Sequence, residues 1–209
     1  MTPVLEEVAD RRGRAEFVRL PFRLYRNDPY WVPPLKREQM KMLTPGKHPF
    51  HEHADVQLFL ARDSEGTPVG RVAAVVNHTH NAYHSERTGF FGFLESVHDD
   101  GVFTALLDRA SQWLRDRGMD RVRGPMNFST NEECGMLVKG FGDSPLLMMP
   151  YKPPWYPEMM ERAGFRKARD LLAYSVDRYE QEFDRLGRIA DLAARRTDAT
   201  VRSIDMGNL

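Results

Sequence analysis

Apolar residues are densest between residues 55 and 115, where their spacing predicts three strands followed by a helix. Residues 55–62 alternate apolar with polar positions, which is typical of a half-buried strand. Residues 69–76 are almost continuously small or β-branched, which favours a central strand, and the turn sequence between the two (DSEGT) predicts a hairpin. A third apolar run, residues 90–97, contains three phenylalanines and predicts a strand buried on both faces.

The third strand runs directly into an amphipathic helix. Residues 98–101 (HDDG) form a turn with two aspartates that can cap a helix. Apolar positions between residues 103 and 114 then recur at spacings of three and four, so that one stripe faces a core. A strand feeding a helix in this way is half of a crossover unit, whose ligand pocket lies where strand and helix meet. Glu95, Ser96 and His98 are therefore expected near any ligand.

Shorter elements flank this centre, and they divide the chain into three parts. We assign residues 1–54 to an N-terminal helical and loop region, 55–178 to the core, and 179–209 to a C-terminal helix with the start of a further strand or second domain. The expected elements outside the centre are a helix at 14–25 despite Pro21, a proline-aromatic loop at 27–35, a strand at 121–128 interrupted by Gly-Pro, a short helix starting at 129–132, a helix at 154–161, a strand at 165–177, a helix at 179–195 and the start of a strand at 201–204.

Composition narrows the class of protein. Of 209 residues, 41% are hydrophobic and 29% charged, which is the balance of a folded globular protein. Lys plus Arg equals Asp plus Glu at thirty each, which argues against a nucleic-acid partner. The single cysteine, Cys134, fits a reducing compartment. Because no apolar run approaches a membrane span and the first residues, MTPVLEEVADRRGR, lack an apolar signal core, we expect a cytoplasmic protein without a membrane partner.

Six of the seven histidines fall in two clusters, residues 48–53 and 78–84. His78 and His80 would share one face if the preceding strand continued through them, as two zinc ligands can. Neither cluster has the cysteine or carboxylate spacing of a zinc signature, so we expect no metal and interpret these as hydrogen-bonding loop histidines. Cys134 follows two glutamates, which would raise its pKa and disfavour a nucleophilic thiol.

The element order β-β-β-α-β-α-β, ending in Tyr-x-x-x-Met-Glu-Arg-Ala-Gly-Phe at residues 156–165, resembles the GNAT superfamily of N-acetyltransferases. The stretches GRVAAVVNHTHN, GFFGFLES, VRGPMNFSTNEECGML and MMPYKPPWYPEMMERAGFRKARDLLAY look like a poorly characterised bacterial branch of it. The resemblance covers residues 14–177 and implies an α/β (α+β) GNAT-like fold, with a central mixed, mostly antiparallel sheet flanked by helices. Members of that branch tend to be longer, so a second acyltransferase-like half, or a second copy in a homodimer, is left open as a partner.

The resemblance also implies substrates and the residues that bind them. The acyl donor would be acetyl-CoA or another acyl-CoA, and the acceptor a small-molecule amine. In the superfamily, backbone N–H groups at the fourth strand and the following helix bind the donor's pyrophosphate, and polar groups on the fifth strand line its pantetheine arm. The matching positions here are Ser96, Val97, Gly101, Asn127, Ser129 and Asn131.

Two residues are carried over as catalytic. Glu95 matches a carboxylate that deprotonates the amine, and a pocket walled by Phe91 and Phe93 would raise its pKa toward neutrality by desolvation. The alternative is a glutamate that pairs with an arginine or caps the turn. The position of the family's general-acid tyrosine is Met160 here, and Tyr156, or Tyr151 before the helix, is a loose substitute for it.

The sequence favours an enzyme, a GNAT-like N-acyltransferase using acyl-CoA. The alternative is a catalytically silent GNAT-like domain that binds a ligand or partner, in which Asp99 and Asp100 occupy the cofactor turn. A transferase of the same architecture that uses an aminoacyl-tRNA donor is disfavoured, because the balanced charge offers no basic surface for tRNA.

Overall fold

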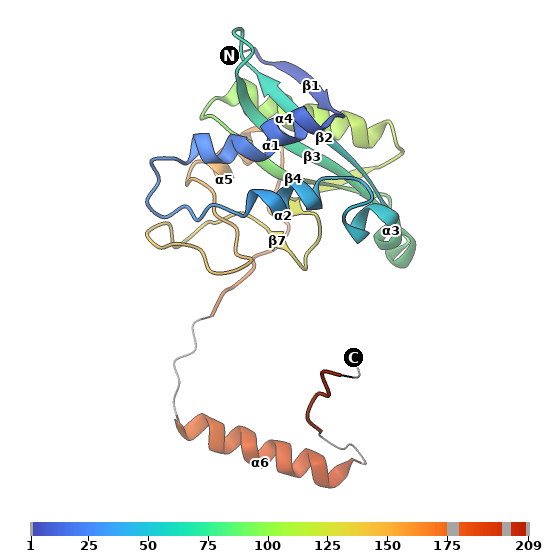
Figure 1. The fold of residues 1–209 in the computed structure, drawn as a ribbon, viewed down its shortest axis with the longest axis vertical. Coiled ribbons are helices and arrows are strands. Elements are labelled where there is room, and N and C mark those ends of the chain that lie inside the picture. Colours follow the sequence, from blue (N-terminus) through green and yellow to red (C-terminus); the bar gives the residue numbers. More distant parts are fainter. Residues whose placement is uncertain (1, 175–179, 198–201, 208–209) are drawn as a thin grey trace. The chain divides into compact units, whose positions relative to one another are not determined.

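The computed structural model describes residues 2–174, 180–197 and 202–207, and the chain divides into two units, Met1–Arg169 and Asp170–Leu209. The first unit is built on a five-stranded sheet in the order β1-β2-β3-β4-β5 (Figure 1). Neighbouring strands are antiparallel except β4 and β5, which are parallel, so the expected mixed, mostly antiparallel sheet is confirmed. The strands are β1 (Val4–Val8), β2 (Ala54–Arg62), β3 (Pro68–Asn77), β4 (Thr88–Ser96) and β5 (Arg121–Arg123).

Strand β1 is the element that the sequence did not predict. Its five residues, VLEEV, carry two glutamates and lie in the region expected to be helix and loop, yet they pair antiparallel with β2 along its whole length. Glu6 and Glu7 reach outward to arginines, Glu6 to Arg62 and Glu7 to Arg109. An edge strand tolerates such charges because one side of it faces solvent, and they discourage pairing with another chain.

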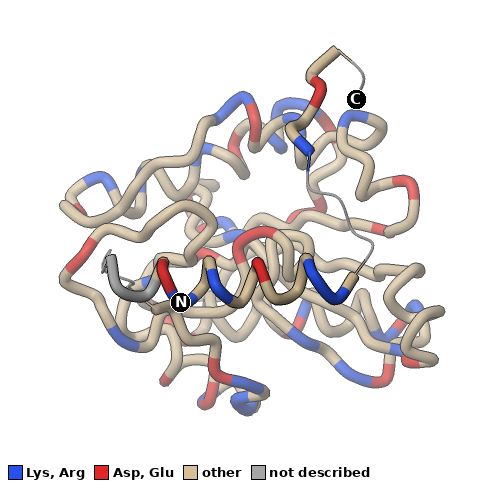
Figure 2. Tube along the Cα trace, turned by 90° about the horizontal axis from the view of Figure 1, so that it is seen from below, with Lys and Arg blue, Asp and Glu red and all other residues tan. Residues whose placement is uncertain are grey.

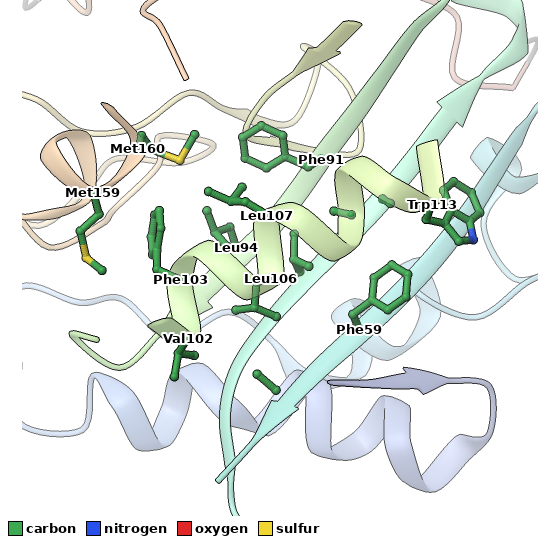
Figure 3. Close-up of a cluster of buried hydrophobic side chains, with 14 of the residues drawn as sticks. Phe59, Phe91, Leu94, Val102, Phe103, Leu106, Leu107, Trp113, Met159 and Met160 are labelled. Carbon is green, nitrogen blue, oxygen red and sulfur yellow. The ribbon is translucent and has the colours of Figure 1, made fainter. Parts of the chain in front are cut away.

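Both faces of the sheet are covered, which explains the continuous apolar run in β3. Helix α4 (Asp100–Arg115) lies on one face and α1 (Arg11–Leu24) packs on the other (Figure 1). From Val72 to Val76 the side chains of β3 alternate between the two cores, as expected from the period of a strand. Figure 3 shows the α4 core, in which Phe103, Leu106 and Leu107 meet Phe91 and Leu94 of β4, with Phe59, Trp113, Met159 and Met160 around them.

Helix α1 forms although Pro21 lies inside it. Its start is fixed by Asp10, whose side chain accepts a hydrogen bond from the Gly13 backbone N–H at 2.7 Å. Proline has no N–H to donate to the carbonyl four residues earlier, which belongs to Phe17. The guanidinium of Arg71, on β3, donates to that Phe17 oxygen at 2.7 Å instead. The carbonyl that the proline leaves unpaired is thus satisfied from the sheet.

Strands β4 and β5 part after a short parallel ladder. They pair from Thr88 opposite Arg121 to Phe90 opposite Arg123, and the Gly124–Pro125 peptide that follows is cis. The chain then forms β6 (Met126–Asn127), which pairs with β7 (Glu133–Cys134) in a separate two-stranded sheet. The Gly-Pro interruption expected at 121–128 therefore splits the predicted strand in two.

The remaining helices of the first unit are short. They are α2 (Lys36–Met42), the 3-10 helix η1 (Pro49–Glu52), α3 (His78–His84) and α5 (Tyr156–Arg162). Residues 78–84 were expected to be a loop, but Asn77 caps them, its side chain accepting from the His80 N–H at 3.0 Å. His78 and His80 therefore do not share a strand face.

Two other expectations differ from the structure. The short helix expected from residues 129–132 is a turn, because the side chains of Ser129 and Glu132 bond within it and β7 begins at Glu133. Residues 165–174 of the strand expected at 165–177 are irregular, and the rest of that strand lies outside the described residues.

The second unit contains α6 (Glu180–Arg196), which confirms the helix expected at 179–195, although residue 179 lies outside the described part of the chain. Of the strand expected at 201–204, residue 201 is also outside it and residues 202–204 form none. The three-part division of the chain stays a prediction. Within the described residues, every helix is too short or too polar to cross a bilayer.

Candidate functional site

The centre of the candidate site is the carboxylate of Glu95, near the end of β4. Arg71 stands directly opposite it on β3, and its Nε donates to Glu95 Oε2 at 2.9 Å. Lys152, in the segment before α5, donates from Nζ to Glu95 Oε1. All three side chains are buried, with 4 to 6% of each residue exposed. A buried glutamate thus joins two strands and a loop through two cations.

The electrostatics of this cluster differ from the sequence expectation. Burial raises the pKa of Glu95, but the charges and hydrogen bonds of Arg71 and Lys152 together lower it by more than burial raises it. The pKa of Glu95 therefore lies below the ordinary value. The idea that desolvation leaves this pKa near neutrality is therefore wrong. The structure shows the arginine pairing that was the alternative. Glu95 is an ionised, fully hydrogen-bonded carboxylate, and its catalytic role stays a prediction.

Tyr156 lies next to this cluster, at the start of α5. Its hydroxyl oxygen accepts a hydrogen bond from the Ser96 backbone N–H at 3.0 Å and lies 3.5 Å from the hydroxyl of Tyr25. Burial raises the pKa of Tyr156 well above its usual value, and the charge of Glu95 raises it further. Tyr156 is thus a protonated phenol at neutral pH. The structure brings the two predicted catalytic residues together, and neither is open to solvent.

The segment that carries Lys152 is held on both sides by aromatic residues, through a hydrogen bond of Tyr151 and ring stacking of Trp155. Tyr151 donates from its hydroxyl to Asp28 Oδ2 at 2.6 Å, and burial together with this carboxylate raises the pKa of Tyr151 to about 12. Trp155 stacks on His98 with ring centroids 4.4 Å apart and an interplanar angle of 7°. The two proline-aromatic segments, 27–35 and 151–157, therefore meet beside the Glu95 cluster.

The turn that begins α4 is occupied by its own side chains. Asp99 accepts from the Val102 N–H at 3.0 Å, and this hydrogen bond is the main reason that its pKa is lowered. Asp100 pairs with Arg162 at 2.8 Å, and Gly101 is exposed in the first turn. A pyrophosphate would meet carboxylates where it needs free N–H groups. In this conformation the α4 turn does not fit the pyrophosphate of an acyl-CoA.

Ser96 and Val97 continue β4 toward that turn. The Val97 N–H donates to the carbonyl of Val69 at 2.9 Å, and the hydroxyl of Ser96 donates to the Val97 carbonyl at 2.8 Å. The Ser96 N–H is bonded to Tyr156. Both residues lie at the expected end of the strand, with these backbone groups already hydrogen-bonded within the protein.

Asn127 bridges the place where β4 and β5 have parted. Its Oδ1 accepts from the Phe93 N–H at 2.6 Å, and its Nδ2 donates to Glu133 Oε2 at 2.8 Å. Phe93 has a positive φ of 51°, at the register irregularity of β4. Position 92 requires glycine, because a Cβ there would lie 1.7 Å from the Met126 carbonyl oxygen. The backbone of β6 thus closes tightly onto β4.

Ser129 and Asn131 take part in the turn that follows β6. The backbone N–H and the hydroxyl of Ser129 donate to Glu132 Oε2 at 2.9 and 2.8 Å. The N–H of Asn131 donates to the Ser129 hydroxyl at 3.2 Å, and Asn131 is exposed. These contacts are turn chemistry. A role along a pantetheine arm stays a prediction for both residues.

The sequence reasoning missed the partners of Glu95, although one signal was present. Arg71 is the single charged residue in the apolar run 69–76, and a charge at a central strand position requires a buried partner. Lys152 lies in the proline-aromatic segment 151–157. Nothing local in the sequence shows that it reaches β4, 57 positions away.

The other residues considered for chemistry lie apart from this site. No three His, Cys, Asp or Glu side chains gather into a metal site in the described ranges 2–174, 180–197 and 202–207. His80 and His84 lie on one face of α3 with ring centroids 4.4 Å apart. Burial raises the pKa of the Cys134 thiol. Two open surface hollows, of about 500 and 460 Å³, lie along α4, and neither includes a residue of the Glu95 cluster.

Comparison of the structure with solved structures identifies its class. The tandem GNAT protein from the clavulanic acid biosynthesis pathway superposes with a TM-score of 0.51 at 15% identity, over 78% of this chain and 43% of that one. The chain therefore has the fold of the GNAT superfamily, as the sequence resemblance implied.

Two curated proteins are similar in sequence. The bacterial ceramide synthase of Caulobacter vibrioides is 38% identical over 197 residues, which is 91% of this chain and 49% of that protein. Protein YghO of Escherichia coli K12 is 34% identical over 190 residues, which is 90% of this chain and 48% of that protein. The chain thus spans about half the length of the curated relatives it matches. No family model matches it.

Proposed function

We propose that the chain is an N-acyltransferase domain that transfers an acyl group from acyl-CoA to an amine. The observation that carries this proposal is the parting of β4 and β5 after Phe90 and Arg123, beside a buried cluster of ionisable side chains in a GNAT fold. In that fold, parted strands admit the acyl-bearing arm of the donor. Glu95, on β4, and Tyr156, on α5, lie beyond the point where the two strands part, and because β6 closes onto Gly92 there, admitting the arm requires β6 to move.

The name of one relative suggests the substrate class. Ceramide is the amide of a long-chain amino alcohol and a fatty acid, so a ceramide synthase forms an amide bond at an amine. With 38% identity over nine-tenths of this chain, that relative supports a long-chain amino alcohol as acceptor here. A long-chain acyl-CoA is then the donor that we propose in preference to acetyl-CoA.

The roles of the two buried residues follow from their protonation states. The amine nitrogen attacks the thioester carbonyl, the carbon–sulfur bond breaks, and the nitrogen loses a proton while the thiolate gains one. Glu95 is ionised and can accept the proton once Lys152 moves away, and Tyr156 is protonated and can donate one to the thiolate. The proposal therefore requires the segment around Lys152 to open.

The donor's contacts are proposed with one restriction. Because Asp99 occupies the α4 turn, we assign the pyrophosphate no place there in this conformation. The donor arm would run between β4 and the turn after β6, past Ser96, Val97 and Gly101 on one side and Asn127, Ser129 and Asn131 on the other. Asn127 would then release the Phe93 N–H that it now holds.

A second candidate function has its own observation. In a catalytically silent domain, the carboxylate at the α4 turn would only cap the helix and Glu95 would only stabilise the core through its two ion pairs. The contacts of Asp99 and Glu95 match that description. Such a domain would serve a partner, either a second acyltransferase-like half or a second copy of the chain.

Titration calorimetry of the purified chain separates the two functions. We expect saturable micromolar binding of a long-chain acyl-CoA and weaker binding of acetyl-CoA, each accompanied by a thermal shift. With an amine acceptor, Glu95→Gln should abolish turnover; because it also leaves Arg71 and Lys152 without their carboxylate, turnover is compared only at temperatures where circular dichroism shows the variant folded. Glu65→Gln, in the exposed β2–β3 turn, is the matched control and should keep full activity. A folded chain that binds neither thioester at millimolar concentration contradicts the proposal.

A further inference from the structure

A surface between α1 and the end of α2 combines exposed apolar side chains with basic ones. Val32 and Leu35 are 53 and 74% exposed, and Tyr30 is 40% exposed. Lys36, Arg37 and Lys41, on the adjoining helix α2, are exposed as well, and α2 has no buried residue. We call these six residues the α2 surface.

Charge is distributed unevenly here although the whole chain is neutral. Residues 23–50 contain six Lys or Arg, all exposed, against two Asp or Glu. Elsewhere in the described chain acidic and basic residues are mixed along the backbone (Figure 2), although residues 162–169 also carry four basic side chains and no acidic one. The α2 surface is therefore locally cationic.

The apolar side chains of this surface are exposed because the loop is held by other residues. Trp31 packs edge-on against Phe22 at 5.2 Å and lies 5.4 Å from Tyr25, and the ammonium of Lys36 sits 4.4 Å above the Phe22 ring. These contacts secure the loop from the inside. Val32 and Leu35 are left facing water, so their apolar surface is available to a ligand or partner.

A second exposed apolar segment comes next to the same loop. Leu146, Leu147 and Met148 are 76, 91 and 53% exposed, and they precede Tyr151, whose hydroxyl bonds to Asp28 at the base of the loop. The chain segments that carry the two groups of exposed apolar residues are thus joined by the hydrogen bond between Tyr151 and Asp28. Aliphatic side chains among Lys and Arg fit a lipid surface, whereas single-stranded nucleic acid is bound by rows of exposed aromatic rings, of which this surface has one, Tyr30.

We propose that the α2 surface binds the face of an anionic lipid bilayer, with Val32 and Leu35 entering the interface and the basic side chains contacting phosphate headgroups. Attachment of this kind needs no membrane-spanning segment, so it is compatible with the helices described above. It departs from the expectation that the chain has no membrane partner. The inference rests on the surface alone and stands whether or not the chain is an acyltransferase.

Vesicle sedimentation of the 209-residue chain tests the proposal. Vesicles of phosphatidylcholine with phosphatidylglycerol should sediment the chain, pure phosphatidylcholine should do so far less, and added salt should reverse the binding. Arg37→Gln with Lys41→Gln, which spares the contact of Lys36 with Phe22, should lower the partition coefficient about 30-fold, from about 1 kcal/mol for each charge. Val32→Ser with Leu35→Ser should lower it at least about tenfold.

Two control variants make the test decisive. Leu171→Ser with Leu172→Ser changes residues that are equally exposed, 66 and 72%, but lie outside the α2 surface, and it should leave binding unchanged. Phe183→Ser with Ile189→Ser removes apolar side chains from α6, whose charges balance at four acidic and four basic residues. Loss of binding in the α6 variant with retention in the α2-surface variants would overturn the proposal. So would binding to neutral vesicles that salt does not weaken, or no sedimentation of a folded chain.

Discussion

Replacing Arg71 with methionine removes one of the two cations that hold the buried carboxylate of Glu95. Methionine is unbranched and apolar and replaces the aliphatic stem of arginine, so the change removes the charge and its hydrogen bonds while keeping most of the packing. The guanidinium donates to Glu95 and to the Phe17 carbonyl, and it also lies 4.8 Å from the centre of the Phe17 ring. All of these contacts are lost together.

The loss of stability in Arg71→Met is estimated from the buried polar groups that lose a partner. Breaking a buried ion pair costs about 3–5 kcal/mol, and because Lys152 still holds Glu95 we take about 3. The unpaired Phe17 carbonyl adds about 1 kcal/mol. A loss of about 4 kcal/mol corresponds to a fall in Tm of about 8–16 °C for a domain of this size.

Urea denaturation followed by circular dichroism measures this loss. Arg87→Met is the matched control, since Arg87 pairs with Asp120 at the surface with 71% of its side chain exposed, and it should cost under about 0.5 kcal/mol. If Arg71→Met costs no more than Arg87→Met, the ion pair is not what stabilises this region. The triple change Arg71→Met, Glu95→Leu, Lys152→Met should recover most of the loss, because no charge then stays buried.

The same cluster predicts a dependence on pH. The folded-state pKa of Glu95 is depressed, so its ion pairs contribute stability that is present above the pKa of the unfolded chain. That contribution is lost as the pH falls through the folded-state pKa, below the ordinary carboxylate range. In Arg71→Met the folded-state pKa should rise, so acid unfolding should begin at a higher pH than in the unmodified chain.

Three further substitutions test individual contacts. Asp99→Ala removes the cap of α4 and should cost about 1 kcal/mol in urea denaturation, whereas an unchanged midpoint would mean that the cap is not stabilising. Gly92→Ala places a Cβ against the Met126 carbonyl and should cost more than about 3 kcal/mol or displace β6. Displacement of β6 would be detected as a loss of amide hydrogen-exchange protection. Normal protection together with normal stability would contradict the close approach. Tyr156→Phe leaves the buried Ser96 N–H without its acceptor and should cost about 1–3 kcal/mol, so a Tm equal to that of the unmodified chain would show that this hydrogen bond is dispensable.

The central elements of the fold were readable from the sequence, because their patterns match the environment that surrounds them. The run at 69–76 is apolar at successive positions because α1 and α4 cover both faces of β3. The stripe of α4 has a helical period, and helices α1, α5 and α6 also occur where they were expected. Strand β1 escaped prediction because VLEEV is short and charged, and it becomes a strand only by pairing with the edge of β2.

The candidate site was predictable only in part. Its position at the end of β4 follows from the topology of a strand that leads into a helix. Its electrostatics do not, because Arg71 and Lys152 come from other segments, and their charges reverse the effect of burial on the pKa of Glu95. The fit of the α4 turn also depends on a local competition, in which Asp99 binds the N–H group that a phosphate would use.

Pro21 and Arg71 are 50 positions apart, yet they form a complementary pair through the Phe17 carbonyl. Alanine at position 21 would supply a backbone N–H that can donate to the Phe17 oxygen, so the hydrogen bond from Arg71 would no longer be needed there. Conversely, an apolar residue at position 71 would leave the proline's missing hydrogen bond unrepaired. In related sequences the two positions are therefore expected to change together, so covariation between them would be a signature of this buried cluster that can be read without a structure.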